Sequence, residues 1–386
     1  MGPIILLDKS TFQSLSHDQV GFLFKHYMVC IPPVLIMEIM GDISKPPRPG
    51  NFKQNDAQWL AQKIEAGDSG ISASCREMVA AALLGQSIPM TGQIPMDTGV
   101  RVPNPGGGYG VIFEEHPARK ALRNWAAGNF SDFDRNASQS LRETIHSFDL
   151  ENFKKRNPPI AEEVKRIKTV GDVLSLVDML LDSDEPDAKL ANLNRCLGMF
   201  NAAEPLKTAV SNRWVQAGMP KLNKFAPYAA FCYRAYTAFI IGLSTGVFST
   251  RSSNVVDLEY VWYLPFCWIF ASSDNFHKLL VPLLLRADQE FVAGEVLKED
   301  LKNIGDEWQR LDEQGREERR IHFGAYPPEL EGSFSYRMSK KYCKPRTPYC
   351  GDPLAKFPEK QRKEMERKIV EEINRKFEPY RRMKGD

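Results

Sequence analysis

The 386-residue sequence has no large excess of charge of either sign, with 51 Lys and Arg residues against 49 Asp and Glu residues. A net charge of only +2 does not by itself indicate a nucleic-acid or membrane partner, so any such signal has to be local. The 42% of hydrophobic and 26% of charged residues are typical of a folded, water-soluble chain that can bury a sizeable core.

Cysteine is scarce, and its seven residues are odd in number and scattered: Cys30, Cys75, Cys196, Cys232, Cys267, Cys343 and Cys350. This pattern indicates reduced thiols in a cytoplasmic protein rather than a disulfide framework. Cys343 and Cys350 lie close together in a segment rich in Lys, Tyr and Pro. Zinc binding there would need two more ligands and only His322 is near, so plain loop cysteines are favoured.

Long hydrophobic runs are also missing. The apolar run at residues 3–7 is too short for a signal peptide and has no basic flank before it. Residues 225–248 are largely apolar, but they include Pro227 and Arg234, which favours a buried core helix over a membrane span.

Three phosphate-related motifs are absent as well. No Gly-x-Gly-x-x-Gly follows the first predicted strand, which argues against a Rossmann-type nucleotide binder. The run Pro-Gly-Gly-Gly-Tyr-Gly at 105–110 lacks the spacing and the Lys-Ser/Thr ending of a phosphate loop. A haloacid-type phosphatase would need a second Asp two residues after Asp8, where Ser10 stands.

The pattern of apolar residues predicts strands that alternate with helices at both ends of the chain, which indicates an α/β fold. The strands are predicted at residues 3–8, 27–31 and 266–270. Residues 86–112, with several prolines and glycines, predict a long loop or hairpin. Helices are predicted near residues 55–66, 70–84, throughout 115–216, and at 221–248, 251–264, 287–303, 305–318 and 359–380.

These elements suggest three parts. A discontinuous α/β core is predicted over residues 1–45 and 225–330. Residues 46–224 are predicted to form a mainly helical insertion in it, and residues 331–386 a basic C-terminal loop and helix.

Two acids follow apolar strands, Asp8 after Ile4–Leu7 and Asp274 after the strand at 266–270. In an open α/β sheet, ligands bind in the crevice at the carboxyl ends of the strands, so both side chains are expected in one cleft. Either acid could instead cap the helix that follows it.

Two further acids can reach the same edge. Glu38 lies on the helix that Pro32 and Pro33 open, and Asp42 is its rival one turn further along. Asp257 lies on the helix before the last predicted strand, with Glu259 beside it.

The ordered set of four acids resembles a PIN-like nuclease domain. The resemblance is carried by four pieces: Asp8-Lys9-Ser10, Ile31-Pro32-Pro33 through Glu38, Asp257, and Ser272-Ser273-Asp274-Asn275-Phe276. It covers about residues 1–45 and 225–300. The family's members are compact, whereas roughly 180 residues separate the second acid here from the helix before the third.

The resemblance implies a three-layer α/β/α fold with a central, mostly parallel sheet, interrupted here by a large α-helical insertion. It implies that Asp8, Glu38, Asp257 and Asp274 hold Mg²⁺ or Mn²⁺ for phosphodiester hydrolysis, with RNA favoured and single-stranded DNA also a candidate. Such ions generate a hydroxide nucleophile and neutralise phosphate charge. Without metal, four clustered carboxylates would repel one another, which makes them an unfavourable structural device.

Residues beside the acids are candidates for supporting roles. Lys9, Arg251 and Asn254 could contact phosphate oxygens, although solvated surface is their commoner fate. Ser10 and Ser272 could position a water or a phosphate, or cap helices, and His277 could touch the site one turn after Asp274.

Residues 334–386 carry the one local excess of charge, with 16 Lys and Arg against 8 Asp and Glu, interleaved with Tyr336, Tyr342, Tyr349 and Tyr380. Basic and aromatic residues together suit single-stranded nucleic acid, although a solvated charged helix would look the same. The alternative function is a non-catalytic module that binds nucleic acid or a partner protein through the helical insertion. No membrane partner is expected.

Overall fold

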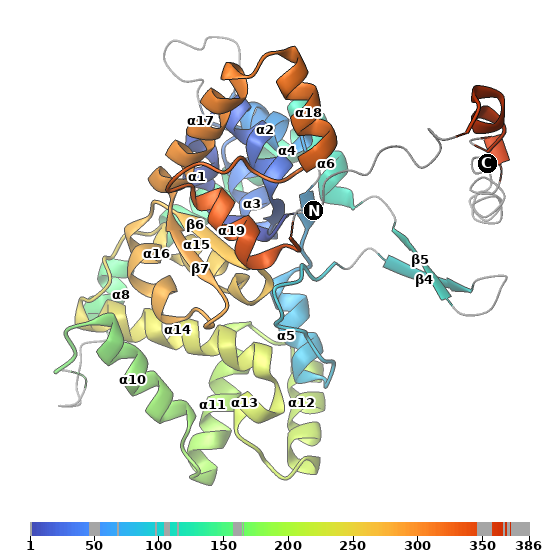
Figure 1. Cartoon of the computed structure of the whole chain (residues 1–386). Coiled ribbons are helices and arrows are strands. Elements are labelled where there is room, and N and C mark those ends of the chain that lie inside the picture. Colours follow the sequence, from blue (N-terminus) through green and yellow to red (C-terminus); the bar gives the residue numbers. More distant parts are fainter. Residues whose placement is uncertain are drawn as a thin grey trace. The chain divides into compact units, whose positions relative to one another are not determined.

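Five short strands form the central sheet of the protein: β1 (Ile4–Leu7), β2 (Met28–Ile31), β3 (Ser69–Ile71), β6 (Ile269–Ser272) and β7 (Glu290–Ala293). All neighbouring strands are parallel, and their order is β3-β2-β1-β6-β7. Figure 1 labels β6 and β7 of this sheet. Every residue of β6 is buried, so both faces of the sheet are covered. The predicted α/β class is confirmed.

The computed structural model describes residues 2–45, 55–67, 69–96, 99–103, 109–113, 116–156, 164, 166–345, 357–365, 367, 368 and 371. Residues 1–310 and 325–344 form one compact unit, which contains the sheet. Residues 311–324 and 345–386 form a second unit, with α18 (Glu313–Phe323) and a helical stretch that begins at residue 359. Most of the predicted helix at 359–380 lies outside the described residues.

Several helices of the first unit precede or follow the sheet strands along the chain, or pack on a helix that does. They are α1 (Lys9–Ser14), α2 (His17–His26), α3 (Pro33–Gly41), α5 (Cys75–Leu83), α15 (Asn254–Val261), α16 (Asn275–Leu280), α17 (Gly294–Arg310) and α19 (Phe334–Tyr342). Helix α17 packs on β6, β7 and α2.

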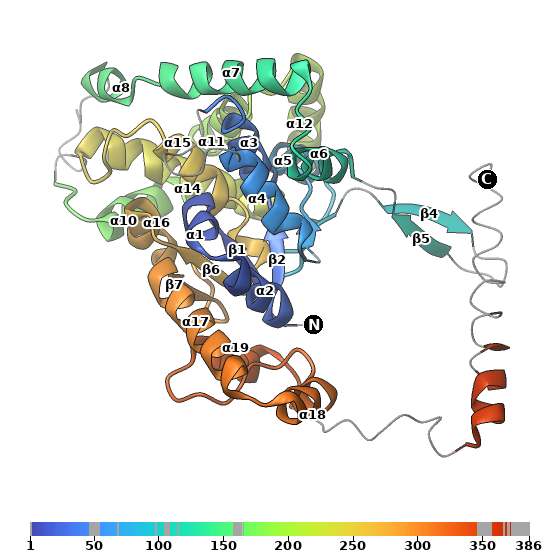
Figure 2. The same cartoon turned by 90° about the horizontal axis from the view of Figure 1, so that it is seen from above.

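The long middle of the chain, from residue 56 to residue 245, is mainly helical among its described residues. Its helices are α4 (Asp56–Glu65), α6 (Pro117–Ala126), α7 (Asp132–Ser147), α8 (Leu150–Arg156), α10 (Val170–Leu181), α11 (Pro186–Met199), α12 (Glu204–Gln216), α13 (Leu222–Phe225) and α14 (Pro227–Thr245). Figure 2 shows α14 and α17 on opposite sides of β6 and β7. Helix α14 packs against α5, α10, α13 and α15.

Local sequence explains where these helices begin and end. Thr169 and Asp172 form a capping box at the start of α10, and Val173, Leu174 and Val177 lie on its buried face at helical spacing. Helix α14 ends at Gly246, whose φ of 79° is in the left-handed region that glycine adopts without strain. Among the described residues no helix, α14 included, is long and apolar enough to cross a membrane.

The strand order creates a switch point beside β1. From β1 the chain proceeds to β2 and β3 on one side, and it later returns to place β6 and β7 on the other. Leu7 pairs with Ala271, so β1 and β6 end side by side, and Leu6 pairs with Cys30 of β2. Ligand crevices of open parallel sheets form at such points. The residues after β1 and β6 therefore lie where a ligand would be expected.

Several predicted boundaries were wrong. Residues Leu264–Phe266 form a 3-10 turn around Pro265, so the strand predicted at 266–270 starts only at Ile269. The helix predicted at 70–84 begins only at Cys75, and strand β3 occupies the start of that segment. A strand of three residues, Ser-Gly-Ile, is too short to show an alternating apolar pattern. Strand β7 likewise lies within the segment predicted as a helix at 287–303. The residues predicted as one helix at 305–318 belong to two helices, α17 and α18.

Two part boundaries also move. Strand β3 belongs to the sheet although it lies within the segment 46–224 predicted as an insertion. Helix α19 belongs to the first unit although it lies within the predicted C-terminal part.

The residues predicted as a loop or hairpin contain an antiparallel pair, β4 (Gly99–Pro103) and β5 (Tyr109–Phe113).

Lys63 of α4 fixes the end of α1. Its side chain is 0% exposed, and Nζ donates to the carbonyl oxygens of Phe12 (3.1 Å), Gln13 (3.1 Å) and Leu15 (2.5 Å). The last carbonyls of a helix have no partners within it and carry partial negative charge, which a buried ammonium complements. Nζ also lies 3.2 Å from the ring centre of Trp59. The position of α1, which begins beside Asp8, therefore depends on a lysine about 50 residues away.

We expect Lys63→Met to lower the free energy of unfolding by about 2–4 kcal/mol, because it leaves buried carbonyl groups without donors. Urea unfolding followed by circular dichroism measures this, with the slope m unchanged. Lys302→Met removes an exposed lysine of α17 and is the control, with a change of about 0.5 kcal/mol or less expected. Equal losses in the two variants would contradict the capping role of Lys63.

Candidate functional site

Asp8 follows β1 directly and is the N-cap of α1. Its Oδ1 accepts a hydrogen bond from the Thr11 backbone N–H at 2.9 Å. Its Oδ2 accepts from Ser10 Oγ at 2.9 Å and from Ser272 Oγ at 2.7 Å. The bond from Thr11 confirms the helix-capping role that the sequence allowed for Asp8. Together these hydrogen bonds hold the buried carboxylate at the end of the central strand.

Ser272, the last residue of β6, joins the two acids that follow β1 and β6. Besides donating to Asp8, its Oγ accepts from the Asp274 backbone N–H at 3.0 Å and lies 2.9 Å from His277 Nδ1. Ser272 is fully buried. It therefore fixes the loop that carries Asp274 to the carboxylate of Asp8.

His277 is a buried partner of this network. Its Nε2 lies 2.7 Å from the backbone oxygen of Asp257, an acceptor, so Nε2 carries a proton. With Ser272 donating to Asp8, Nδ1 also has to donate, and the network is complete when His277 is an imidazolium. Burial lowers the pKa of His277, but Asp8, with Nδ1 at 3.7 Å from its Oδ2, and Asp257 raise it above the usual value. Burial raises the pKa of Asp8, and His277 brings it below the usual value.

Asp274 caps α16, with Oδ1 accepting from the Phe276 backbone N–H at 2.8 Å. Its Oδ2 lies 3.4 Å from Arg251 Nη1. Arg251 is 61% exposed, so its guanidinium stands at the edge of the network and faces solvent. The sequence prediction placed Arg251 beside the acids, and the structure puts it there.

Glu38 reaches the network from α3. Tyr260 of α15, which is fully buried, donates from its hydroxyl to Glu38 Oε2 at 2.5 Å. Burial raises the pKa of Glu38, and the charges of Asp8 and Asp42 raise it further, while Lys9 and Tyr260 oppose the rise. Tyr260 was missed from the sequence, because one aromatic residue on an apolar helix gives no sign of a partner on α3.

Asp257 lies in the first turn of α15. Its Oδ2 is buried and has no hydrogen-bond partner. The pKa of Asp257 is raised to about 7, mainly by burial; His277 lowers this pKa, and the charges of Asp274, Glu38 and Asp8 raise it. The four predicted acids therefore lie near enough to act on one another electrostatically.

The remaining predicted residues have other partners. Asn254 is buried, and its Nδ2 donates to Ser249 O at 2.7 Å and to Ser249 Oγ at 3.1 Å, so its predicted contact with phosphate is replaced by a role in holding the turn before α15. Lys9 Nζ lies 2.7 Å from Asp42 Oδ2. Asp42, the rival of Glu38, is thus the ion-pair partner of Lys9.

Among the described residues, no group of three or more His, Cys, Asp or Glu side chains is arranged so that it could hold a metal ion. The carboxylate oxygens of Asp8 and Asp274 are directed to helix N–H groups, serine hydroxyls and Arg251 instead. Of the two cysteines weighed as a zinc site, Cys350 lies outside the described residues, as do residues 105–108 of the glycine-rich run.

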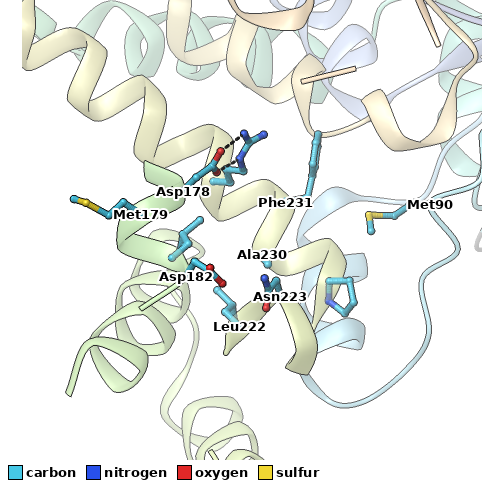
Figure 3. A pocket seen from close by; sticks show the side chains of 11 residues that line it. Met90, Asp178, Met179, Asp182, Leu222, Asn223, Ala230 and Phe231 are labelled. Atoms are coloured by element: carbon cyan, nitrogen blue, oxygen red, sulfur yellow. Dashed lines mark hydrogen bonds and ion pairs between the residues drawn. The ribbon is translucent and has the colours of Figure 1, made fainter. Parts of the chain in front are cut away.

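A cavity of about 700 Å³ lies elsewhere, between α10, α13 and α14 (Figure 3). Its lining is mostly apolar, with Leu222 and Phe231 among the side chains that line it. Arg234 and Asp178 form a two-pronged ion pair at it, with distances of 2.5 and 2.7 Å. None of the four acids lines this cavity.

No protein-family model, curated protein or solved structure matches this chain.

We expect Ser272→Ala to lower the free energy of unfolding by about 1–3 kcal/mol, because Asp8 and the Asp274 N–H lose a buried partner. Ser10→Ala is the matched control, since Ser10 also donates to Asp8 Oδ2 but is exposed. It should change stability by about 0.5 kcal/mol or less. Urea unfolding at one pH compares the two, and a larger loss in Ser10→Ala would show that Ser272 is not the joint between the strands.

Proposed function

We propose that this chain is a divalent-metal-dependent endonuclease of the PIN-like kind. It would hydrolyse phosphodiester bonds, with RNA favoured over single-stranded DNA, in the cytoplasm. Asp8, Glu38, Asp257 and Asp274 would hold Mg²⁺ or Mn²⁺.

One observation supports the proposal: four acids from separate parts of the sequence lie around the switch point of a parallel sheet, near enough to influence one another's pKa. Asp8 follows β1 and Asp274 follows β6, which pair at this point. Glu38 and Asp257 lie on α3 and α15, which pack together. These are the positions that the PIN-like resemblance assigns to the four acids. The helix after the second strand is opened by Pro33, also in keeping with it.

The donor chemistry fits a hard divalent ion, which prefers carboxylate oxygens. The buried Oδ2 of Asp257 has no hydrogen-bond partner, as expected of an atom reserved for a ligand. Asp8 and Asp274 are held by hydrogen bonds in the present arrangement. Their carboxylates, and those of Glu38 and Asp257, would have to turn toward one shared point to coordinate an ion.

A bound ion would activate water and neutralise charge on the phosphate. The chain's own groups would complete the environment. Arg251 stands exposed beside Asp274 and can pair with a phosphate oxygen on arrival. Tyr260 orients Glu38 through its hydroxyl, and Ser272 and His277 orient Asp8.

The preference for single-stranded substrate rests on the basic C-terminal sequence. Part of that signal is used inside the fold, because Tyr342 donates to the Asp288 carbonyl oxygen and Lys341 pairs with Glu290 at 2.8 Å. Tyr349 and Tyr380 lie outside the described residues. The excess of Lys and Arg beyond residue 344 remains the feature that supports binding to a phosphate backbone.

We expect Asp8→Asn and Asp274→Asn each to reduce cleavage of labelled single-stranded RNA in Mn²⁺ by about 100-fold or more, since losing a ligand removes several kcal/mol of charge stabilisation. Asn caps helices as well as Asp does, and circular dichroism verifies that each variant is folded before cleavage is compared. Asp288→Asn, at an exposed acid paired with Arg286, is the control and should cleave at the wild-type rate. Unchanged cleavage in both site variants would refute the proposal.

A second candidate is a non-catalytic module that binds a protein through its helical segment. The cavity in Figure 3 favours it, because an apolar lining with an ion pair at its rim suits a partner's apolar side chain. Calorimetry with Mn²⁺ separates the candidates. Heat of binding that disappears in Asp8→Asn supports the nuclease, and no binding at millimolar Mn²⁺ supports the module.

A further inference from the structure

The cavity between α10, α13 and α14 has one guanidinium group among mostly apolar side chains (Figure 3). Its α14 wall consists of residues spaced three or four apart, which places them on one face of the helix: Pro227, Ala230, Phe231 and Arg234. Arg234 is the only charged residue in the sequence between Lys224 and Arg251. A single positive charge therefore lies on an otherwise apolar helix face that borders a cavity.

Arg234 is paired with Asp178 of α10. Its Nε lies 2.5 Å from Oδ1 and its Nη2 lies 2.7 Å from Oδ2. The side chain of Asp178 is 52% exposed and that of Arg234 is 27% exposed. Ion pairs as exposed as this one contribute little to stability. Helix α10 already packs on α14 and has a buried apolar face of its own, so the ion pair adds little to the packing of the two helices.

Asp178 is the partner of this pair that can leave. Water would solvate its carboxylate after release, whereas the guanidinium would stay beside apolar walls, where its attraction to an anion is stronger than in water. Nη1 of Arg234 makes no hydrogen bond within the described part of the chain. Asp182, which also lines the cavity, is held by Lys221, with Nζ 3.0 Å from Oδ1. Arg234 is therefore the group in this cavity that can receive an anion.

We propose that this cavity binds a small organic anion with an apolar body, whose carboxylate or sulfonate pairs with Arg234 in place of Asp178. The volume of about 700 Å³ lies within the range of small-molecule sites, about 300–1,000 Å³. The planar fork of a guanidinium suits such an anion. Leu222, Ala230 and Phe231 would contact the apolar body. The inference is independent of the proposed metal site, because none of the four acids lines this cavity.

The experiment compares a charged dye with its neutral counterpart, since a partner's apolar side chain would use the same walls but would need no anion. The probes are 1-anilinonaphthalene-8-sulfonate and N-phenyl-1-naphthylamine, which has the same rings without the sulfonate. Both fluoresce more strongly in apolar surroundings. Each is titrated into the full-length protein in the presence of a chelator, so that no divalent ion contributes.

Arg234→Gln should raise the dissociation constant of the sulfonate dye by about 10-fold or more, and change that of the neutral dye by less than about 2-fold, because only the charged contact is lost. Asp178→Asn should lower the dissociation constant of the sulfonate dye by about 3-fold, because the dye no longer displaces a charged partner. An ion pair that only held α10 against α14 would give changes in the same direction for both variants.

Arg286 and Asp288 form the matched control pair. Arg286 also holds its aspartate through Nε and Nη2, at 2.9 and 3.4 Å, the two side chains are 32% and 50% exposed, and neither residue lines the cavity. Arg286→Gln and Asp288→Asn should each leave binding of both dyes within about 2-fold of wild type. Ala230→Phe, which fills the cavity from its α14 wall, should abolish binding of both dyes. Circular dichroism and thermal unfolding verify that each variant is folded.

Equal affinity of the sulfonate dye for wild type and Arg234→Gln would overturn the proposal, as would no binding to wild type. Weaker binding in both Arg234→Gln and Asp178→Asn would also overturn it, since the pair would then support the cavity without exchanging partners. Unchanged binding in folded Ala230→Phe would place the dye elsewhere and refute this site. Binding of the neutral dye alone would overturn the role of the anion and favour a partner's apolar side chain. None of these outcomes bears on the nuclease, which Mn²⁺-dependent cleavage tests separately.

Discussion

Burial and three neighbouring carboxylates together raise the pKa of Asp257 to about 7. Acids that approach one another so closely at a sheet edge destabilise the folded chain unless positive charge or hydrogen bonds offset the repulsion. Two buried groups do so here: His277 beside Asp8 and Asp257, and Tyr260 on Glu38. Lys9 and Arg251 add positive charge at the rim. Cationic and hydrogen-bonding groups therefore offset the repulsion among the acids at the carboxyl ends of these strands.

The same contacts also hold the fold together. Asp8 begins α1, and Lys63 closes the other end of that short helix from α4. Ser272 ties the end of β6 to Asp8, and the Ser273 N–H bonds to Thr11 Oγ1, so the two strands at the switch point are linked beyond their ladder. Moving the acids would disturb the central strands. Helix caps therefore fix the side chains of Asp8 and Asp274 in their present positions.

How far the sequence predicts this arrangement depends on the range of each interaction. Asp8 and Asp274 are predictable, because an acid directly after an apolar strand is a local pattern and parallel strands align their ends. Strands β3 and β7 are not, because three or four residues next to a helix leave no period to detect. Tyr260, Lys63 and the pairing of Lys9 with Asp42 depend on helices that meet only in the folded chain. Asn254 shows the converse: it lies near the acids in the sequence, but its side chain donates to the backbone of Ser249 in the preceding turn.

Helix capping and metal binding are not exclusive roles for these carboxylates. A cap uses one oxygen of Asp274 and leaves the other to Arg251 at an exposed position, where it can exchange partners. Glu38 and Asp257 have no cap to satisfy, and their raised pKa values show that burial already disfavours their charged forms. A cation bound beside these two acids would lower the cost of burying their charged forms. In the proposed metal site, Asp8 and Asp274 would set the position, and Asp257, whose buried Oδ2 has no hydrogen-bond partner, would gain most from a bound ion.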